Sequence, residues 1–272
     1  LWAKYTDLDI EKTGASYSFS DLSRFAADNG FYPNISALRN KVEAVVRKTD
    51  TPYRVSSQYF KSNPASDVKS KMYLIESKEE YLKQNTSNGD QKDKIVNELR
   101  SEISLMWISQ NYTNEESDEY LEKYESLLTH DDHVTRIERL IWDKEYQQAE
   151  KILNLISADY KKYFSNVMQI LKYPKRLKKY VRGIPRNFRS TELSKYAQAR
   201  WYFKNNKTSM AVKMIKGVEK MQDPEKWWGL RLVYVRELLK SEDAKDAYKI
   251  SSGHGLTEES KKYWEAQWTS GW

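Results

Sequence analysis

The sequence contains no cysteine. This absence excludes disulfide bonds, thiolate metal sites and cysteine nucleophiles. Glycine and proline are also scarce, with 9 and 6 copies in 272 residues. A β-sandwich or β-barrel needs many turns built on these two residues, so their scarcity favours long helices joined by short connections.

Long hydrophobic runs are missing as well. No stretch of about 18 apolar residues occurs, so the sequence predicts no transmembrane helix. The hydrophobic content of 39% and the mean hydropathy of −0.87 are low for a globule with a single core. These values favour a thin, elongated fold in which each helix pair buries one face against its neighbour. The 20 tyrosines and 9 tryptophans compensate for the few aliphatic residues, because they bury a ring and keep a polar tip in water.

The motifs of common catalytic sites are absent. The sequence has no GxGxxG, no Walker loop, no GxSxG and no HExxH. The carboxylate pairs Glu79/Glu80 and Glu115/Glu116 stand in polar, lysine-rich surroundings. Acid–base chemistry on a glycoside needs a carboxyl group whose pKa is raised in a pocket, so we interpret both pairs as solvated helix faces.

Two histidines three residues apart suggest a metal site. His130 and His133 flank two aspartates, however, and directly follow Thr129. A hydroxyl followed by acidic residues is typical of a helix N-terminus, where the acids favour the positive end of the helix. We therefore predict a polar helix start here, and neither a catalytic residue nor a metal or cofactor site in the chain.

Helix starts, turns and apolar periodicity divide the second half of the chain into helices. Thr113 and Glu116 have the spacing of a capping box, which predicts that a helix begins there. The following rhythm predicts helices at about 130–142, 145–156, 158–172, 190–205, 208–220, 224–240, 243–252 and 258–271.

An internal repeat is the strongest structural signal. The pattern is an apolar residue, an alanine twelve positions later and a second apolar residue three positions after that alanine. It occurs three times: at Ile137, Ala149 and Ile152; at Ala199, Ala211 and Met214; and at Val235, Ala247 and Ile250. Each copy predicts a helix, a short turn and a second helix, with a small residue where the two approach. The spacing fits repeats of 31–36 residues and resembles the tetratricopeptide period of about 34. We therefore predict an all-α, right-handed superhelix (solenoid) of antiparallel, tetratricopeptide-like helix pairs, with an N-terminal helical region at 1–112 continuous with a repeat region at 113–272.

The positive charge is concentrated in one segment. The chain carries a net charge of +7, but residues 160–191 hold ten lysines and arginines and no acid, so the remainder is net negative. Such a local block argues against a general nucleic-acid-binding surface. The candidate contacts for a glycan or another anion are Lys175, Arg176, Lys178, Lys179, Arg182 and Arg186. The alternative is a solvated helix pair whose interleaved tyrosines are core.

Tryptophans cluster in the last fifty residues. Trp227 and Trp228, together with Trp264, Trp268 and Trp272, are candidates for a carbohydrate platform. The last three recur every four residues and therefore share one face of a helix. We expect that face to pack against the preceding helix pair, and the tryptophans to be core.

Several stretches together resemble the helical superdomain of soluble lytic murein transglycosylases. They are 128–142 (LTHDDHVTRIERLIW) with Ala149, 196–201 (YAQARW), Trp227-Trp228, Ala247-Tyr248, 254–257 (HGLT) and 265–272 (EAQWTSGW). The resemblance implies a periplasmic bacterial enzyme in which a superhelix forms a ring or horseshoe. A lysozyme-like domain follows it and cleaves the MurNAc–GlcNAc linkage of peptidoglycan to a 1,6-anhydro product, with one glutamate as acid and then base.

The catalytic signature of that family is not in this chain. The glutamate normally lies in a Glu-Ser pair followed by Gly-Leu-Met-Gln, and none of the four Glu-Ser pairs here has that continuation. No catalytic residue can therefore be carried over. The resemblance implies an inactive superhelical portion, truncated at its C-terminus, whose export signal has been removed. Its expected partners are peptidoglycan glycan strands, its own missing catalytic domain and other cell-wall proteins. The alternative function is a tetratricopeptide-like module that binds protein and has no glycan role.

Overall fold

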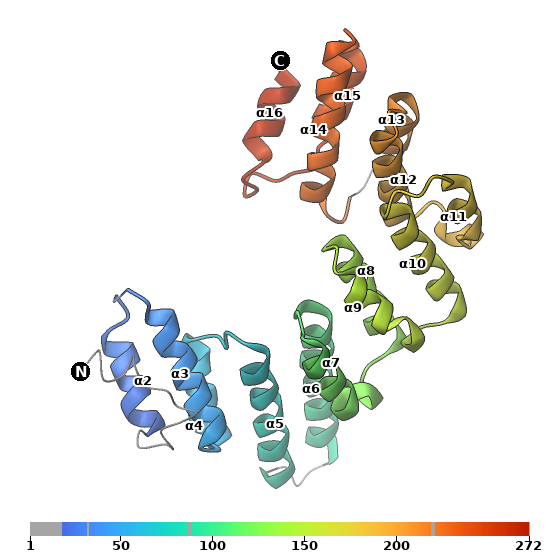
Figure 1. The fold of residues 1–272 in the computed structure, drawn as a ribbon. Coiled ribbons are helices and arrows are strands. Elements are labelled where there is room, and N and C mark those ends of the chain that lie inside the picture. Colours follow the sequence, from blue (N-terminus) through green and yellow to red (C-terminus); the bar gives the residue numbers. More distant parts are fainter. Residues whose placement is uncertain (1–17, 32, 86–88, 219–220, 272) are drawn as a thin grey trace. The chain divides into compact units, whose positions relative to one another are not determined.

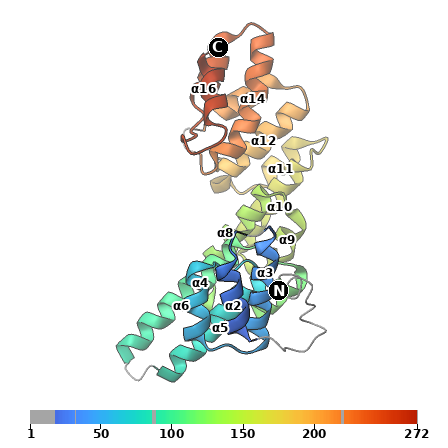
Figure 2. The same cartoon turned by 90° about the vertical axis from the view of Figure 1, so that its left-hand side faces the viewer.

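The chain is an all-α protein. The computed structural model describes residues 18–31, 33–85, 89–218 and 221–271, with the side chains of 89–92, 94 and 95 left aside. These residues contain fifteen α-helices and three short 3-10 helices, and no strand. The chain forms two compact units, Leu1–Asp132 and His133–Trp272. Within each unit, consecutive helices pack side by side in chain order (Figure 1 and Figure 2).

The N-terminal unit is built from sequential helices. They are α2 (Phe19–Asp28), α3 (Ile35–Lys48), α4 (Tyr53–Ser62), α5 (Val68–Asn85), α6 (Gly89–Ser109), α7 (Asn114–Tyr124) and a 3-10 helix at Glu125–Leu127. Leu22 and Ala26 of α2 pack with Leu38, Val42 and Val45 of α3 in one apolar cluster. Helix α5 packs against both α4 and α6.

Aromatic side chains form the core beneath α6 and α7. Trp107 and Tyr120 are both fully buried and stack with ring centroids 5.6 Å apart. The Tyr120 hydroxyl donates a hydrogen bond to the Ile103 carbonyl at 2.8 Å, which satisfies the polar tip of a buried ring. The predicted capping box is confirmed, because Thr113 and Glu116 bond reciprocally at the start of α7.

The C-terminal unit contains the predicted repeats. Helix α8 (His130–Trp142) crosses the boundary between the units, and the remaining helices are α9 (Tyr146–Lys151), α10 (Ala158–Leu171), α11 (Leu177–Gly183), α12 (Glu192–Lys204), α13 (Thr208–Lys216), α14 (Pro224–Lys240), α15 (Ala244–Ser252) and α16 (Tyr263–Gly271), with 3-10 helices at Leu153–Leu155 and Arg186–Phe188. The helix predicted at 145–156 is thus interrupted after Lys151, and the last helix begins at Tyr263, not near 258. Helix α11 was not predicted.

The three repeat copies share one turn geometry. Seven residues after the first apolar position, the backbone of Lys144, Asn206 and Glu242 is left-handed, with φ of 68°, 54° and 60°. In each copy the next N–H bonds back to the carbonyl five residues earlier: Glu145 to Leu140 at 2.8 Å, Lys207 to Tyr202 at 2.9 Å and Asp243 to Leu238 at 2.9 Å. This is the 6→1 bond of a Schellman turn, which ends a helix and satisfies its free carbonyls.

The small residue of each copy lies in the core. Ala149, Ala211 and Ala247 are at most 2% exposed. The helix–turn–helix units predicted from the sequence are therefore confirmed. The predicted division of the chain between residues 112 and 113 stays a prediction.

Candidate functional site

The predicted basic residues lie on and beside α11 in the C-terminal unit. Lys178, Lys179 and Arg182 belong to the helix, Lys175 and Arg176 precede it, and Arg186 begins the following 3-10 helix. All six residues are exposed. Among the described residues, no carboxylate forms an ion pair with any of the six. We call these six residues the basic block; its charges are free to meet an anionic ligand.

Buried contacts fix the backbone of the basic block. Leu177 and Ile184 are at most 6% exposed and anchor the two ends of α11. Arg189 donates from Nε to the Ile184 carbonyl at 2.9 Å and from Nη2 to the Arg182 carbonyl at 3.0 Å. A side chain at Gly183 would collide with Asn166 of α10, so glycine permits the close approach of α11 to α10.

The tyrosines near the basic block are divided between core and surface. Tyr163 is 3% exposed, stacks on Phe188 at 4.7 Å and shares a 2.8 Å hydrogen bond with the Thr191 hydroxyl. It is core, as the alternative interpretation expected. Tyr180 is half-buried and carries the Lys179 ammonium 5.4 Å from its ring centroid.

A second cationic feature combines residues from separate elements. The Arg200 guanidinium of α12 lies 5.8 Å from the ring centroid of Tyr173 and 5.7 Å from that of Tyr196. Burial raises the pKa of Tyr146 on α9, and the charge of Arg200 opposes that shift. Tyr196 and Arg200 are four positions apart on α12, but Tyr146, Tyr173 and Tyr196 are 23 to 50 positions apart. The sequence interpretation missed this cluster because no local periodicity links those three tyrosines.

Tyr173 has an unusual backbone. Its φ is 55°, in the left-handed region where a bulky side chain is disfavoured. Pro174 follows, and its carbonyl accepts a 2.7 Å hydrogen bond from Trp201 Nε1. That bond fixes the strained turn to α12, and so holds the Tyr173 ring against Arg200.

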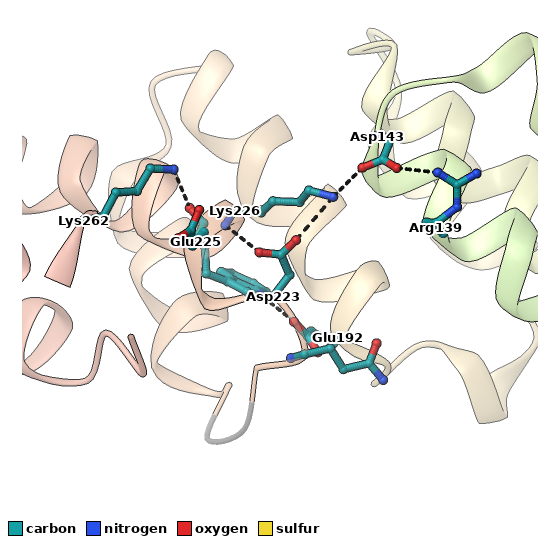
Figure 3. Close-up of polar contacts among 9 residues, drawn as sticks. Arg139, Asp143, Glu192, Asp223, Glu225, Lys226 and Lys262 are labelled. Carbon is teal, nitrogen blue, oxygen red and sulfur yellow. Dashed lines mark hydrogen bonds and ion pairs between the residues drawn. The ribbon is translucent and has the colours of Figure 1, made fainter. Parts of the chain in front are cut away.

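Charged side chains connect α8 with α14 in the same unit (Figure 3). Asp143 accepts from Arg139 at 3.0 Å and from Lys226 at 2.8 Å, and Lys226 also contacts Asp223 at 3.3 Å. Asp223 in turn caps α14 by accepting from the Lys226 backbone at 3.0 Å. Every charge in this group has a partner, which is typical of a structural role.

One carboxyl group has a raised pKa that the sequence did not reveal. Burial raises the pKa of Glu138, and the nearby charge of Glu192 raises it further. Glu192 accepts from Trp227 Nε1 at 2.6 Å and from the Gln222 backbone at 2.9 Å (Figure 3). The raised pKa of Glu138 is explained by burial and by its nearness to Glu192.

The carboxylate pairs considered from the sequence are surface features. Glu79 pairs with Lys83 at 2.7 Å, and Glu80 accepts from Gln84 at 3.2 Å. Glu115 is exposed, and Glu116 belongs to the capping box of α7. The interpretation as solvated helix faces is confirmed.

The predicted helix start at Thr129 is also confirmed. Asp132 accepts from the Thr129 backbone at 2.7 Å, and the Asp132 N–H donates to the Thr129 hydroxyl at 3.2 Å. Among the described residues, no group of three or more histidines and carboxylates is arranged to hold a metal ion.

The tryptophan prediction is half right. Trp227 and Trp228 are buried, at 0% and 1% exposed, as expected. Trp264 and Trp268 are 68% and 66% exposed, so the prediction that they are core is wrong. The buried face of α16 is instead formed by Ala266, and Trp272 lies outside the described residues.

Comparisons with protein-family models, curated proteins and solved structures gave no match to this chain. In the described part of the chain, no helix is long and apolar enough to cross a membrane.

Proposed function

We propose that this chain is the superhelical scaffold portion of a periplasmic lytic transglycosylase. Its helix pairs would form a right-handed, tetratricopeptide-like solenoid that positions a peptidoglycan strand for a catalytic domain outside this chain. The bond cleavage itself would belong to that domain, because no catalytic residue of the family can be assigned here.

The observation that carries the proposal is that residues from several of the stretches that resemble the family pack against one another. Trp228, Leu256 and Ala266 form one buried cluster. Trp228 Nε1 donates to Glu265 at 2.9 Å, and its ring meets that of His254 edge to face at 6.2 Å. Residues spread over nearly forty positions thus assemble one junction between α14 and α16, which supports a shared architecture over a chance similarity of letters.

The repeated Schellman turns support the solenoid. Matching turns end the first helix of each pair in the same way, and stacking such pairs along one direction would produce a superhelix with an extended binding surface. The basic block would supply a charged contact for such a strand. Peptidoglycan strands carry carboxylates on their peptide stems, and exposed lysines and arginines without carboxylate partners attract such anions.

The test is co-sedimentation of the full chain with insoluble peptidoglycan sacculi. Binding should be strong at about 50 mM salt and weak at about 0.5 M, because exposed charges are screened over a shorter distance as salt increases. The supernatants are assayed for soluble muropeptides, and we expect none above the level without protein.

A matched pair of variants locates the contact. K178Q/K179Q/R182Q removes three charges from the basic block. K213Q/K245Q/K249Q removes three charges from exposed lysines on α13 and α15 of the same unit. We expect the first variant to lose most of the salt-sensitive binding and the second to keep it. If both variants lose the same amount of salt-sensitive binding, the binding depends on the total charge of the chain and not on the basic block.

Two outcomes would overturn the proposal. Release of muropeptides by this chain would contradict a scaffold without a catalytic site. Absence of binding at both salt concentrations would favour the alternative, a module that binds protein and not glycan.

A further inference from the structure

A cleft in the N-terminal unit is a separate candidate for ligand binding. It lies between the turn that joins α3 to α4 and one side of α5, and its volume is about 450 Å³. That volume is within the usual range of small-molecule sites. The turn is tight: Asp50 has a φ of 48°, and the Tyr73 hydroxyl donates to the Thr51 carbonyl at 2.6 Å. The cleft therefore has a fixed wall.

Two tyrosine rings form part of that wall. Tyr53 and Tyr81 lie with ring centroids 5.4 Å apart, and both are half-buried. Arg54 lies toward the hydroxyl end of the Tyr81 ring, with its guanidinium carbon 5.2 Å from the centroid. Rings held in this way present rigid apolar surface at little cost in side-chain entropy.

Polar groups surround the rings. Arg54 donates from Nε and Nη2 to the Tyr81 hydroxyl, at 3.1 and 2.9 Å. The hydroxyl oxygen therefore acts as an acceptor, and its own hydrogen remains available to a ligand. Gln84 donates to Glu80 at 3.2 Å, which leaves the amide carbonyl and one carboxylate oxygen as acceptors at the rim.

The charge of the lining disfavours anions. Asp50 and Glu80 contribute two negative charges and Arg54 one positive charge. Burial, reinforced by Asp50 and two glutamates, raises the pKa of Tyr73 to about 12, so the phenol stays neutral at physiological pH. A cleft with a net negative lining differs from the basic block and does not suit phosphate or sulfate.

We propose that this cleft binds a neutral hexopyranose ring. A pyranose has an apolar face of C–H groups, which fits the Tyr53 and Tyr81 rings, and an edge of hydroxyls, which fits the mixed donors and acceptors of Arg54, Glu80 and Gln84. The N-acetylated sugars of peptidoglycan and unmodified glucose chains share this chemistry. The hexopyranose site itself is independent of the proposed function, and only the choice of the peptidoglycan sugars over glucose chains rests on it.

The experiment is an NMR titration of the full, isotope-labelled chain. The probes are the trisaccharide of N-acetylglucosamine, cellotriose and glucose 6-phosphate, each to about 10 mM, which detects millimolar affinity. We expect at least one neutral sugar to shift the amides of residues 50–54 and 73–85 in a saturable way. Glucose 6-phosphate should bind more weakly than either.

Two variants and one control test the assignment. Tyr81→Ala removes a ring of the wall and should weaken binding about fivefold to tenfold. Glu80→Ala changes an exposed side chain, so folding is not at risk, and should weaken binding about threefold to tenfold. Tyr248→Ala removes a 62% exposed tyrosine from α15 and should leave the affinity unchanged.

The outcomes separate this inference from the proposed function. Absence of saturable shifts in the cleft with both neutral trisaccharides, or tighter binding of glucose 6-phosphate, would overturn the inference even if sacculi still bind through the basic block. Tighter binding of the N-acetylated trisaccharide supports the peptidoglycan source. Tighter binding of cellotriose contradicts peptidoglycan as the source of the sugar but still supports a hexopyranose site. Sugar binding in the cleft without any binding to sacculi would overturn only the proposed function.

Discussion

Enlarging the small residue of one repeat copy should destabilise the C-terminal unit. Ala247 is 2% exposed and sits on the helix of the pair α14–α15 that follows the shared turn. Ala247→Leu adds three carbon atoms at this almost fully buried position. Inserting extra methylenes in a packed core costs about 1–3 kcal/mol. The intrinsic preference for alanine in a helix adds only a few tenths of a kcal/mol.

The change can be measured by thermal unfolding followed by far-UV circular dichroism and tryptophan fluorescence. A loss of about 2 kcal/mol should lower the Tm by roughly 4–10 °C in a unit of this size. The matched control is Ala244→Leu, at an exposed position three residues earlier in α15. It makes the same substitution at the first position of the helix and adds no crowding, so its Tm should stay close to that of the parent chain.

Equal Tm values for the two variants would refute the reasoning. They would mean that α14 and α15 do not meet closely at Ala247. Close packing would then no longer explain why Ala149, Ala211 and Ala247 stand at the same spacing from the first apolar position of each copy. The packing argument for the repeat would fail as well.

Three further predictions concern single side chains. Asp143→Asn weakens the partly exposed ion pairs with Arg139 and Lys226, and should cost about 0.5–1 kcal/mol at low salt and less in urea titrations at high salt. Burial, and then Glu192, raise the pKa of Glu138, so the folded state favours the protonated carboxyl group. The stability that this group contributes is fully present below the ordinary pKa of a glutamate. It is lost as the pH rises through the raised pKa of the folded state. Glu138→Gln should therefore raise the Tm at about pH 8 and leave it nearly unchanged at about pH 3.5, and a larger gain at the acidic pH would contradict the sign. Trp264→Gln should change the free energy of unfolding by about 0.5 kcal/mol or less, whereas Trp228→Ala should cost about 3–5 kcal/mol; comparable losses in urea unfolding would contradict the observed burial.

Helices with strong local end signals were predictable from the sequence. The predicted bounds of 130–142 and 224–240 coincide with α8 and α14. The first begins after the Thr129 cap, and the second has Pro224 at its first position, where a missing N–H costs nothing. Each is followed by a left-handed residue. Where ends, stripe and spacing agree, local preference and tertiary packing choose the same structure.

The segment around α11 shows where this reasoning stops. Pro174 and Pro185 bracket it, and five of the eight residues from Lys175 to Arg182 are basic. A helix of seven residues has too little apolar pattern to be recognised, and is marginal by itself. Its stability comes from burial of Leu177 and from contacts to α10, and such long-range contacts leave no periodic signal.

The tryptophans of α16 fail for a different reason. Spacing by four residues places Trp264 and Trp268 on one helix face, and this inference holds. Periodicity does not say which face meets a neighbour. Ala266 is fully buried and allows α16 to approach Trp228 closely, so the large rings lie on the other side. Size alone therefore misled the assignment of the core.

The residues that carry the family resemblance differ in burial from the residues proposed to bind ligand. Trp228, His254 and Ala266 are at most 6% exposed and hold helices together. Such residues specify how one helix pair joins the next, whatever the protein binds. Glycan contact, by contrast, needs side chains that solvent can reach, such as the exposed Lys179 of the basic block or the half-buried Tyr81 of the cleft. A resemblance carried by buried residues therefore bears on the proposed architecture and not on the ligand. For this reason sacculus binding and sugar titration are tested with variants of residues that solvent can reach.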